Sequence, residues 1–226
     1  MNAKLFRDRI EAGAALAKSL DAYRGSDTLV LGIPRGGVVV AAEIARSLDA
    51  ELDVVVARKL GAPGQPELAI GAVTADGGRF LNEEMIQALH ISASYLDAVT
   101  RVQMAEARHR ETWMRNLRPA VPVAGRIVIL VDDGLATGAT MLAAARALRR
   151  HGPARLVAAA PVATRDACAA LQAEVDEVVC PLQPEPFGAV GLYYQYFEPV
   201  EDEQVRELLE ATRRASAEQA GLDVRG

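Results

Sequence analysis

Short apolar runs alternate with amphipathic stretches along most of this chain. The runs are rich in Val, Ile, Leu and Ala and lack polar alternation, which is typical of strands covered on both faces. They lie at 28–31, 52–57, 127–131, 155–161 and 177–181. Amphipathic periodicity predicts helices at 6–20, 38–48, 141–151 and 164–173. This order predicts an α/β fold, with right-handed βαβ units, a parallel open sheet and helices on both faces.

The opening helix is expected to bury one stripe of its surface. That stripe would consist of Phe6, Ile10, Ala14, Ala17 and Leu20.

The segment between 61 and 125 departs from the alternation. Gly61–Pro66 is so rich in glycine and proline that we expect neither a helix nor a strand there. Two strands are predicted after it, at 67–74 and 79–81, joined by a turn at Asp76–Gly78.

Two helices are predicted in the rest of this segment. Asn82 is expected to cap a short helix. Ser94, with Asp97 in the capping-box position, is expected to begin a long charged helix that ends near Leu117. Much of that helix is expected to face solvent or to form an oligomer contact.

Composition narrows the function. With 226 residues, half of them hydrophobic, the chain can bury one substantial core. A net charge of −5 at pH 7 argues against a general nucleic-acid binder. Charged residues interrupt the first twenty positions, and no apolar run has the length of a membrane span, so we expect a cytoplasmic location without membrane contact. Cys168 and Cys180 have neither disulfide-framework nor zinc-site spacing, and we expect reduced thiols.

The stretch from Ile127 to Thr140 carries the strongest chemical signal. It reads Ile-Val-Ile-Leu-Val-Asp-Asp-Gly-Leu-Ala-Thr-Gly-Ala-Thr. Asp132 and Asp133 follow the buried strand and can accept hydrogen bonds from two vicinal hydroxyls of a ribose. The glycine-containing turn then opens a helix, whose free N–H groups and dipole attract a phosphate. The alternative is an acidic strand end followed by an ordinary helix cap.

This stretch resembles the 5-phosphoribosyl 1-pyrophosphate (PRPP) motif of the type I phosphoribosyltransferases. Two acidic residues after an apolar strand, followed by a loop that ends Thr-Gly-x-Thr, make up the resemblance. It implies that Asp132 and Asp133 bind the ribose. It also implies that the 5-phosphate is bound by Gly134, Leu135, Ala136, Thr137, Gly138, Ala139 and Thr140.

Two further loops are expected at the same edge of the sheet, where open α/β sheets bind ligands. Gly32–Gly37 resembles the pyrophosphate loop of the same family. A pyrophosphate-binding role is therefore assigned to Arg35, Gly36, Gly37, Arg58 and Lys59. The alternative for Arg58 and Lys59 is that they are simply exposed to solvent, as adjacent basic residues usually are. The stretch after Lys59 corresponds in order to the family's mobile region over the active site, and Gly61–Glu67 is the expected lid.

The segment 183–200 concentrates aromatic residues in a chain that has 4% of them. It is similar to the C-terminal hood of purine-using relatives, in which an aromatic ring stacks on the base. Phe187, Tyr193 and Tyr194 are the base-binding candidates. The alternative is a hydrophobic cluster that ties the tail to the sheet. The chain also departs from those relatives, because Ala163 and Thr164 stand where they place a base-reading lysine, and no acid follows Val190-Gly191.

The resemblance implies one domain, 1–226, with a core at about 28–182, a flexible or helical insertion at about 61–125 and a hood at about 183–200 with helices from both chain ends.

The implied activity is transfer of the 5-phosphoribosyl group from PRPP to a nitrogenous base, purine-like in one reading, with release of pyrophosphate. Asp132, Asp133, Lys59 and Arg35 would be the catalytic set. Mg²⁺ would be held by PRPP oxygens, with no direct protein ligand assigned. The partners would be PRPP, a small heterocyclic base and further copies of the chain in a homo-oligomer. The alternative is a PRPP-sensing regulator without catalysis.

Overall fold

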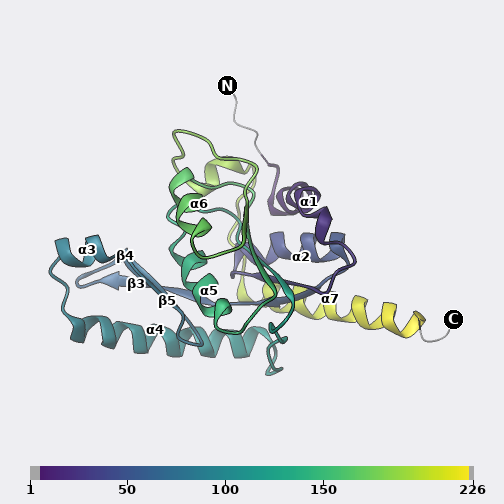
Figure 1. The fold of residues 1–226 in the computed structure, drawn as a ribbon, viewed down its shortest axis with the longest axis horizontal. Coiled ribbons are helices and arrows are strands. Elements are labelled where there is room, and N and C mark those ends of the chain that lie inside the picture. Colours follow the sequence, from purple (N-terminus) through teal and green to yellow (C-terminus); the bar gives the residue numbers. More distant parts are fainter. Residues whose placement is uncertain (1–5, 224–226) are drawn as a thin grey trace.

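The computed structural model describes residues 6–223, with side chains through residue 215, so both ends of the expected domain lie outside the described residues. A five-stranded parallel sheet of order β2-β1-β6-β7-β8 forms its centre (Figure 1). The strands are β1 (Thr28–Gly32), β2 (Glu51–Val54), β6 (Ile127–Val131), β7 (Arg155–Ala159) and β8 (Glu177–Val179). The predicted parallel α/β fold is confirmed.

Helices cover both faces of this sheet (Figure 1). On β6, Ile129 and Val131 join the core beneath α1, α2 and α7, whereas Val128 and Leu130 join the core beneath α5 and α6. The helices are α1 (Arg9–Ser19), α2 (Gly36–Leu48), α5 (Ala139–Arg149), α6 (Arg165–Gln172) and α7 (Asp202–Asp223). Because both faces are buried, the strands are apolar without alternation.

The register of β1 and β6 positions the loops that follow them. Gly32 at the end of β1 pairs with Val131 at the end of β6. Parallel strands in this register release their next residues at the same edge of the sheet. The loops that begin after Gly32 and Val131 therefore lie next to each other.

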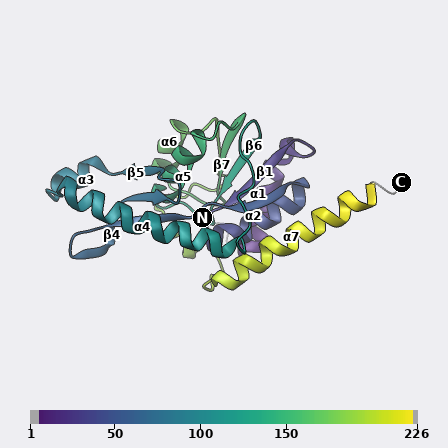
Figure 2. The same ribbon diagram turned by 90° about the horizontal axis from the view of Figure 1, so that it is seen from below.

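A second, three-stranded antiparallel sheet extends from the core on the side of α5 (Figure 1). It consists of β3 (Ala57–Ala62), β4 (Gln65–Thr74) and β5 (Arg79–Leu81), followed by α3 (Glu83–Ala88) and α4 (Ala93–Met114). Figure 2 shows the C-terminal part of α4 beside the start of α7, which then extends beyond the rest of the chain. In residues 6–223, no helix is long and apolar enough to cross a membrane.

The prediction that Gly61–Pro66 is neither helix nor strand is wrong. These residues form the end of β3, a tight turn and the start of β4. A β-carbon on Gly61 would lie 2.7 Å from the Cα of Pro66, and Gly64 has a φ of +71°. The glycines therefore permit a close hairpin. The predicted strand at 52–57 is also too long, because β2 ends at Val54 and Ala57 begins β3.

Helix starts were predicted with mixed success. Asn82 caps α3 by accepting the Met85 N–H, as predicted. The long helix, in contrast, begins at Ala93 with Ser92 as its N-cap, so Ser94 is not the cap. Ser94 has an acid three residues later, whereas Ser92 has Tyr95 at that position, so the capping-box pattern favoured the wrong serine.

The buried stripe predicted for the first helix is correct in part. Phe6, Ala17 and Leu20 are buried, whereas Ile10 is half exposed and Ala14 is exposed. Phe6 precedes α1, which is capped by Asp8. The buried face consists of Ala12, Gly13, Leu16 and Ala17. A Gly in this face allows α2 to approach closely, since a β-carbon on Gly13 would meet Val40 and Glu43.

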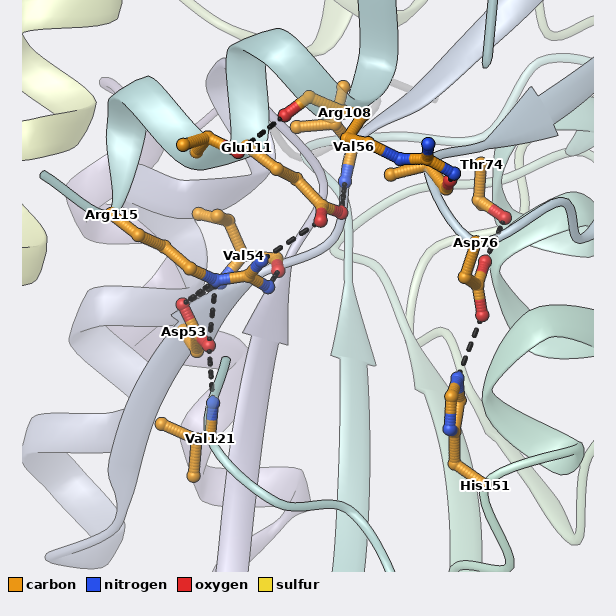
Figure 3. Close-up of polar contacts among 12 residues, drawn as sticks. Asp53, Val54, Val56, Thr74, Asp76, Arg108, Glu111, Arg115, Val121 and His151 are labelled. Atoms are coloured by element: carbon orange, nitrogen blue, oxygen red, sulfur yellow. Dashed lines mark hydrogen bonds and ion pairs between the residues drawn. The ribbon is translucent and has the colours of Figure 1, made fainter. Parts of the chain in front are cut away.

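One fully buried charge joins the sheet to α4. Asp53 on β2 accepts hydrogen bonds from Arg115 Nε at 2.9 Å and from the N–H groups of Val54 and Val121 at 2.9 and 3.0 Å (Figure 3). Arg115 is itself 11% exposed and also pairs with Glu111. A buried charge is tolerated only when it is paired and hydrogen-bonded. Removal of Asp53 would therefore leave Arg115 buried without its main partner.

We predict that Asp53→Ala lowers the free energy of unfolding by about 3–5 kcal/mol, because Arg115 is left buried without its main partner. Urea denaturation of the variant and the wild type measures this. Asp21→Ala removes an exposed ion pair with Arg24 and is the matched control, with an expected loss below about 1 kcal/mol. Equal losses in the two variants would contradict the assigned role of Asp53.

Candidate active site

Two adjacent carboxyl groups follow the end of β6. The N–H of Asp133 donates to Oδ1 of Asp132 at 2.8 Å, and Oδ2 of Asp133 accepts from Arg9 Nε at 2.7 Å. Burial raises the pKa of Asp132, and the neighbouring Asp133 carboxylate raises it further. Burial also raises the pKa of Asp133, while the hydrogen bond and charge of Arg9 oppose that rise. Arg9 is thus the cation that favours the charged form of this pair.

The loop after β1 packs directly against the acidic pair. A β-carbon on Gly36 would lie 1.9 Å from Asp133 Oδ2, and one on Gly37 would lie 2.8 Å from the Cα of Asp132. Side chains of any size are excluded at both positions. The structure therefore brings the predicted pyrophosphate loop and the acidic pair together. The Pro34–Arg35 peptide bond in this loop is cis.

The turn from β6 into α5 offers backbone donors. Within the described part of the chain, the N–H groups of Ala136, Thr137 and Gly138 have no acceptor in the protein. Gly138 has a φ of +70° and precedes the first turn of α5, which no side chain caps. These groups and the helix dipole together can bind an anion.

Other residues of this turn have structural partners. The N–H of Leu135 donates to the carbonyl of Val162, and its side chain is buried in the core. The Ala139 N–H faces Thr137 Oγ1 at 3.4 Å. Gly134 lies so close to Val190 that a β-carbon would meet it at 2.4 Å.

A cationic cavity of about 760 Å³ lies beside the turn. It is lined by Arg35 from the first loop, Arg58 and Lys59 from β3, Arg110 from α4 and Thr140 from α5. The structure therefore brings together all three basic residues that were predicted to bind pyrophosphate. Tyr95 and Gln103 of α4 also line this cavity, and Gln103 accepts a hydrogen bond from Arg58 Nε at 3.1 Å.

Acidic residues at the start of α7 hold two of these cations. Arg35 lies 3.9 Å from Glu201 and 3.8 Å from Asp202. Asp202 also accepts hydrogen bonds from Arg110. Among the described residues Lys59 has no ion pair, so it is the cation of this cavity with the least competition for an anion.

The aromatic candidates of the hood lie against the protein. Tyr193 and Tyr194 are each 5% exposed and pack with Phe6 and Val162. Their hydroxyl groups donate at 2.5 Å to the carbonyl oxygens of Phe187 and Asp133, respectively. The tie to the sheet that was considered as the alternative is therefore present. A stacking role for either tyrosine stays a prediction that requires its ring to be uncovered.

Thr164, which stands where purine-using relatives have a lysine, has two structural contacts. Its hydroxyl caps α6 through the Ala167 N–H and donates to the Ala136 carbonyl in the phosphate turn at 2.8 Å. Arg165 beside it is exposed and pairs with Glu185 at 3.4 Å. Thr164 therefore braces the turn that was predicted to bind phosphate.

Comparison with known proteins agrees with this geometry. The family model of the phosphoribosyl transferase domain matches residues 6–196, which include the acidic pair, both loops and the cationic cavity. The chain belongs to this family.

Two relatives match nearly the whole chain. A Mycobacterium tuberculosis (strain H37Rv) protein named "Putative phosphoribosyl transferase" is 46% identical over 220 residues, which are 97% of this chain and 50% of that protein. The crystal structure of TT1426 from Thermus thermophilus is 47% identical with a TM-score of 0.76, covering 91% of this chain and 97% of that one. The chain spans about half the length of the mycobacterial relative.

A third relative is similar over a shorter stretch. A ribose-phosphate pyrophosphokinase of Methanopyrus kandleri is 43% identical over 84 residues, which are 35% of this chain and 29% of that enzyme.

Sequence reasoning missed the contributions of α1 and α4. Arg9 and Arg110 belong to helices far from the motif in sequence, and Arg9 is separated from Asp133 by 124 positions. One signal was available for Arg9. A cation at the first position of a helix opposes the helix dipole, so its presence there indicates an anionic partner elsewhere.

We predict that Asp132→Asn raises the stability of the folded protein at neutral pH. The folded-state pKa of Asp132 lies above its ordinary value, so the ionised carboxylate costs stability once the pH exceeds that raised pKa. Asn keeps the acceptor for the Asp133 N–H without the charge.

The gain should disappear below about pH 4, where the wild-type carboxyl is protonated in both folded and unfolded states. Urea denaturation at a series of pH values tests this, with the exposed Asp21→Asn as control. A variant that is less stable at neutral pH, or a gain in stability that does not change with pH, would show that the folded-state pKa of Asp132 is not raised.

Proposed function

We propose that this chain transfers the 5-phosphoribosyl group of PRPP to a nitrogenous base, such as a purine, and releases pyrophosphate. The observation that carries the proposal is the adjacency of three features. An amide-rich helix start, a pair of carboxylates and a cationic cavity lie in this order around the ends of β1 and β6. They match the phosphate, the ribose diol and the diphosphate of PRPP.

In this proposal the 5-phosphate lies at the start of α5. The N–H groups of Ala136, Thr137 and Gly138 donate to its oxygens, and the hydroxyls of Thr137 and Thr140 add donors. Gly134, Leu135 and Ala139 shape this turn through its contacts with the rest of the chain.

The ribose hydroxyls donate to the carboxylates of Asp132 and Asp133, which would repel a phosphate. The diphosphate lies in the cationic cavity, near Lys59, Arg58 and Arg35 and against the N–H groups of the glycine loop. Arg35 would exchange its long contacts with Glu201 and Asp202 for the diphosphate oxygens, since a closer anion holds the guanidinium more strongly.

In the reaction, a ring nitrogen of the acceptor forms a bond to C1 of the ribose as the bond from C1 to the pyrophosphate oxygen breaks. The electron pair leaves with the pyrophosphate, and the acceptor nitrogen loses its proton to solvent. Positive charge develops on the ribose ring, as in other glycosyl transfers. The nearby carboxylates stabilise that charge, and Lys59 and Arg35 stabilise the leaving group.

Mg²⁺ is part of the proposal as a cation carried by PRPP. Among the described residues, no group of three or more His, Cys, Asp or Glu side chains can hold a metal ion. Mg²⁺ keeps substrate phosphates and waters as ligands, which fits such a site. When bound, it offsets the charge that develops on the leaving pyrophosphate.

The acceptor base would be bound by the hood. Phe187, half-buried and 5.3 Å from the ring of Tyr193, is the hood candidate that needs the smallest movement to stack on a base. The lid role of Gly61–Glu67, a cytoplasmic location and a homo-oligomer stay predictions. Gly61, Pro66 and Glu67 line the cavity, which supports the lid.

The decisive experiment combines binding with turnover. PRPP with Mg²⁺ should raise the melting temperature, because a ligand that binds only the folded state stabilises it by about 2.7 kcal/mol at a hundredfold excess over its Kd. Pyrophosphate should appear only when a suitable base from a panel of purines and related heterocycles is added. Stabilisation without pyrophosphate release for any base would favour the PRPP-sensing regulator. If PRPP causes neither stabilisation nor release, a PRPP site is excluded.

A charge-removing variant tests the diphosphate position. Lys59→Gln should weaken PRPP binding by about tenfold, because one charge-assisted contact is lost. Ribose 5-phosphate has no diphosphate and should bind the variant and the wild type equally. Isothermal titration calorimetry measures both, with Lys18→Gln on the exposed face of α1 as control. An equal loss for the two ligands would place Lys59 elsewhere on the substrate.

A further inference from the structure

The start of the described chain and the segment 193–198 meet at the acidic pair. The N–H of Phe6 donates to the Tyr193 carbonyl, and the N–H groups of Gln195 and Tyr196 donate to Phe6 and Arg7. Tyr194, in the same segment, donates its hydroxyl to the Asp133 carbonyl. The backbone of Asp133 is therefore held by Tyr194, whose segment pairs with the start of the described chain.

Arg9 completes this junction with a charge. Its Nε donates to Asp133 Oδ2 at 2.7 Å, and its Nη1 donates to the Glu198 carbonyl at 2.9 Å. The guanidinium carbon lies 3.9 Å from the centre of the Phe197 ring, and Phe197 stacks on Tyr194. A β-carbon on Gly36 would lie 2.6 Å from the Arg9 Nε. Contacts from three segments thus fix the guanidinium in one place.

This arrangement is unusual for a surface ion pair. The side chains of Arg9 and Asp133 are 11% and 16% exposed, so water screens their interaction weakly. A planar guanidinium held by a ring and a carbonyl loses little further freedom when it donates to a carboxylate. The orientation of Asp133 therefore depends on Arg9.

We infer that Arg9 is a positioning residue for PRPP, which acts through Asp133 by holding that carboxylate toward the ribose hydroxyls. This inference rests on the proposed function. Arg9 engages Oδ2, which directs a ribose hydroxyl to Oδ1. Without Arg9 the carboxylate is free to turn, and the hydroxyl contact is lost in part of the molecules.

The same contact favours the ionised form of Asp133. The charged and titratable groups that face it are Arg9 from α1, Asp132 beside it and Tyr194 from the C-terminal segment. Burial raises the pKa of the Tyr194 hydroxyl, so that group is neutral. Burial also raises the pKa of Asp133, and the hydrogen bond and charge of Arg9 oppose that rise more than the hydrogen bond with Asp132 does. Removal of Arg9 should raise the pH at which Asp133 becomes protonated.

The test compares Arg9→Gln, Arg9→Lys and Arg7→Gln with the wild type. Arg7 is the matched control, because its side chain is exposed and pairs with Asp8 on the same segment. Binding of PRPP with Mg²⁺ and of inorganic phosphate is measured by calorimetry between about pH 5.5 and pH 8.5. Arg9→Gln should weaken PRPP binding by about tenfold, leave phosphate binding unchanged and move the acid limb of the PRPP profile to higher pH.

Arg9→Lys should restore the pH profile, since it keeps the charge, but only part of the affinity, because it lacks the planar fork. If Arg9→Gln does not fold, Phe197→Ala replaces it. That variant removes the surface on which the guanidinium stacks and keeps the ion pair. It should weaken PRPP binding in the same direction by a smaller factor.

The outcomes separate this inference from the proposed function. If the wild type binds PRPP and Arg9→Gln matches Arg7→Gln in affinity and pH profile, the positioning role is wrong and the proposed function stands. Equal loss of PRPP and phosphate binding indicates general distortion and also overturns the positioning role. If the wild type binds no PRPP, both the positioning role of Arg9 and the proposed function are wrong.

Discussion

Two carboxyl groups lie partly buried next to each other where β6 ends, and the surrounding structure offsets the cost of that burial. The carboxylate of Asp132 accepts a hydrogen bond from the Asp133 N–H, and Asp133 is paired with Arg9. Gly36 and Gly37 let the neighbouring loop pack directly against the pair. Two adjacent, partly buried acids cost stability that a bound ligand can offset. In the proposed function the pair is therefore the centre of the site.

The chain contains a second buried acid with a different role. Asp53 on β2 is fully buried, and its carboxylate accepts hydrogen bonds from Arg115, Val54 and Val121. Asp132 and Asp133 lie at a sheet edge beside free N–H groups and a cationic cavity. The contrast shows why burial alone does not identify a site. What separates them is whether the protein itself satisfies the charge.

Local signals in the sequence predicted the parallel sheet and the residues at its carboxyl edge. The strand at 127–131, its acids and the following turn are contiguous, so their chemistry is visible in one stretch. The hairpin at Gly61–Pro66 was missed because its glycines serve close strand pairing, whereas glycine and proline more often interrupt strands. The contact of Arg9 with Asp133 spans 124 positions and depends on how α1 packs against the segment that contains Phe197 and Glu198, so local patterns do not identify Asp133 as its partner.

The most direct measurement is a crystal structure of the protein with PRPP and Mg²⁺. The account predicts the 5-phosphate on the N–H groups of Ala136, Thr137 and Gly138 and the two ribose hydroxyls on Asp132 and Asp133. The diphosphate should lie beside Lys59, and Arg9 should keep its contact with Asp133. A complex in which the ribose hydroxyls contact neither carboxylate, or in which the phosphate lies away from the start of α5, would contradict the account.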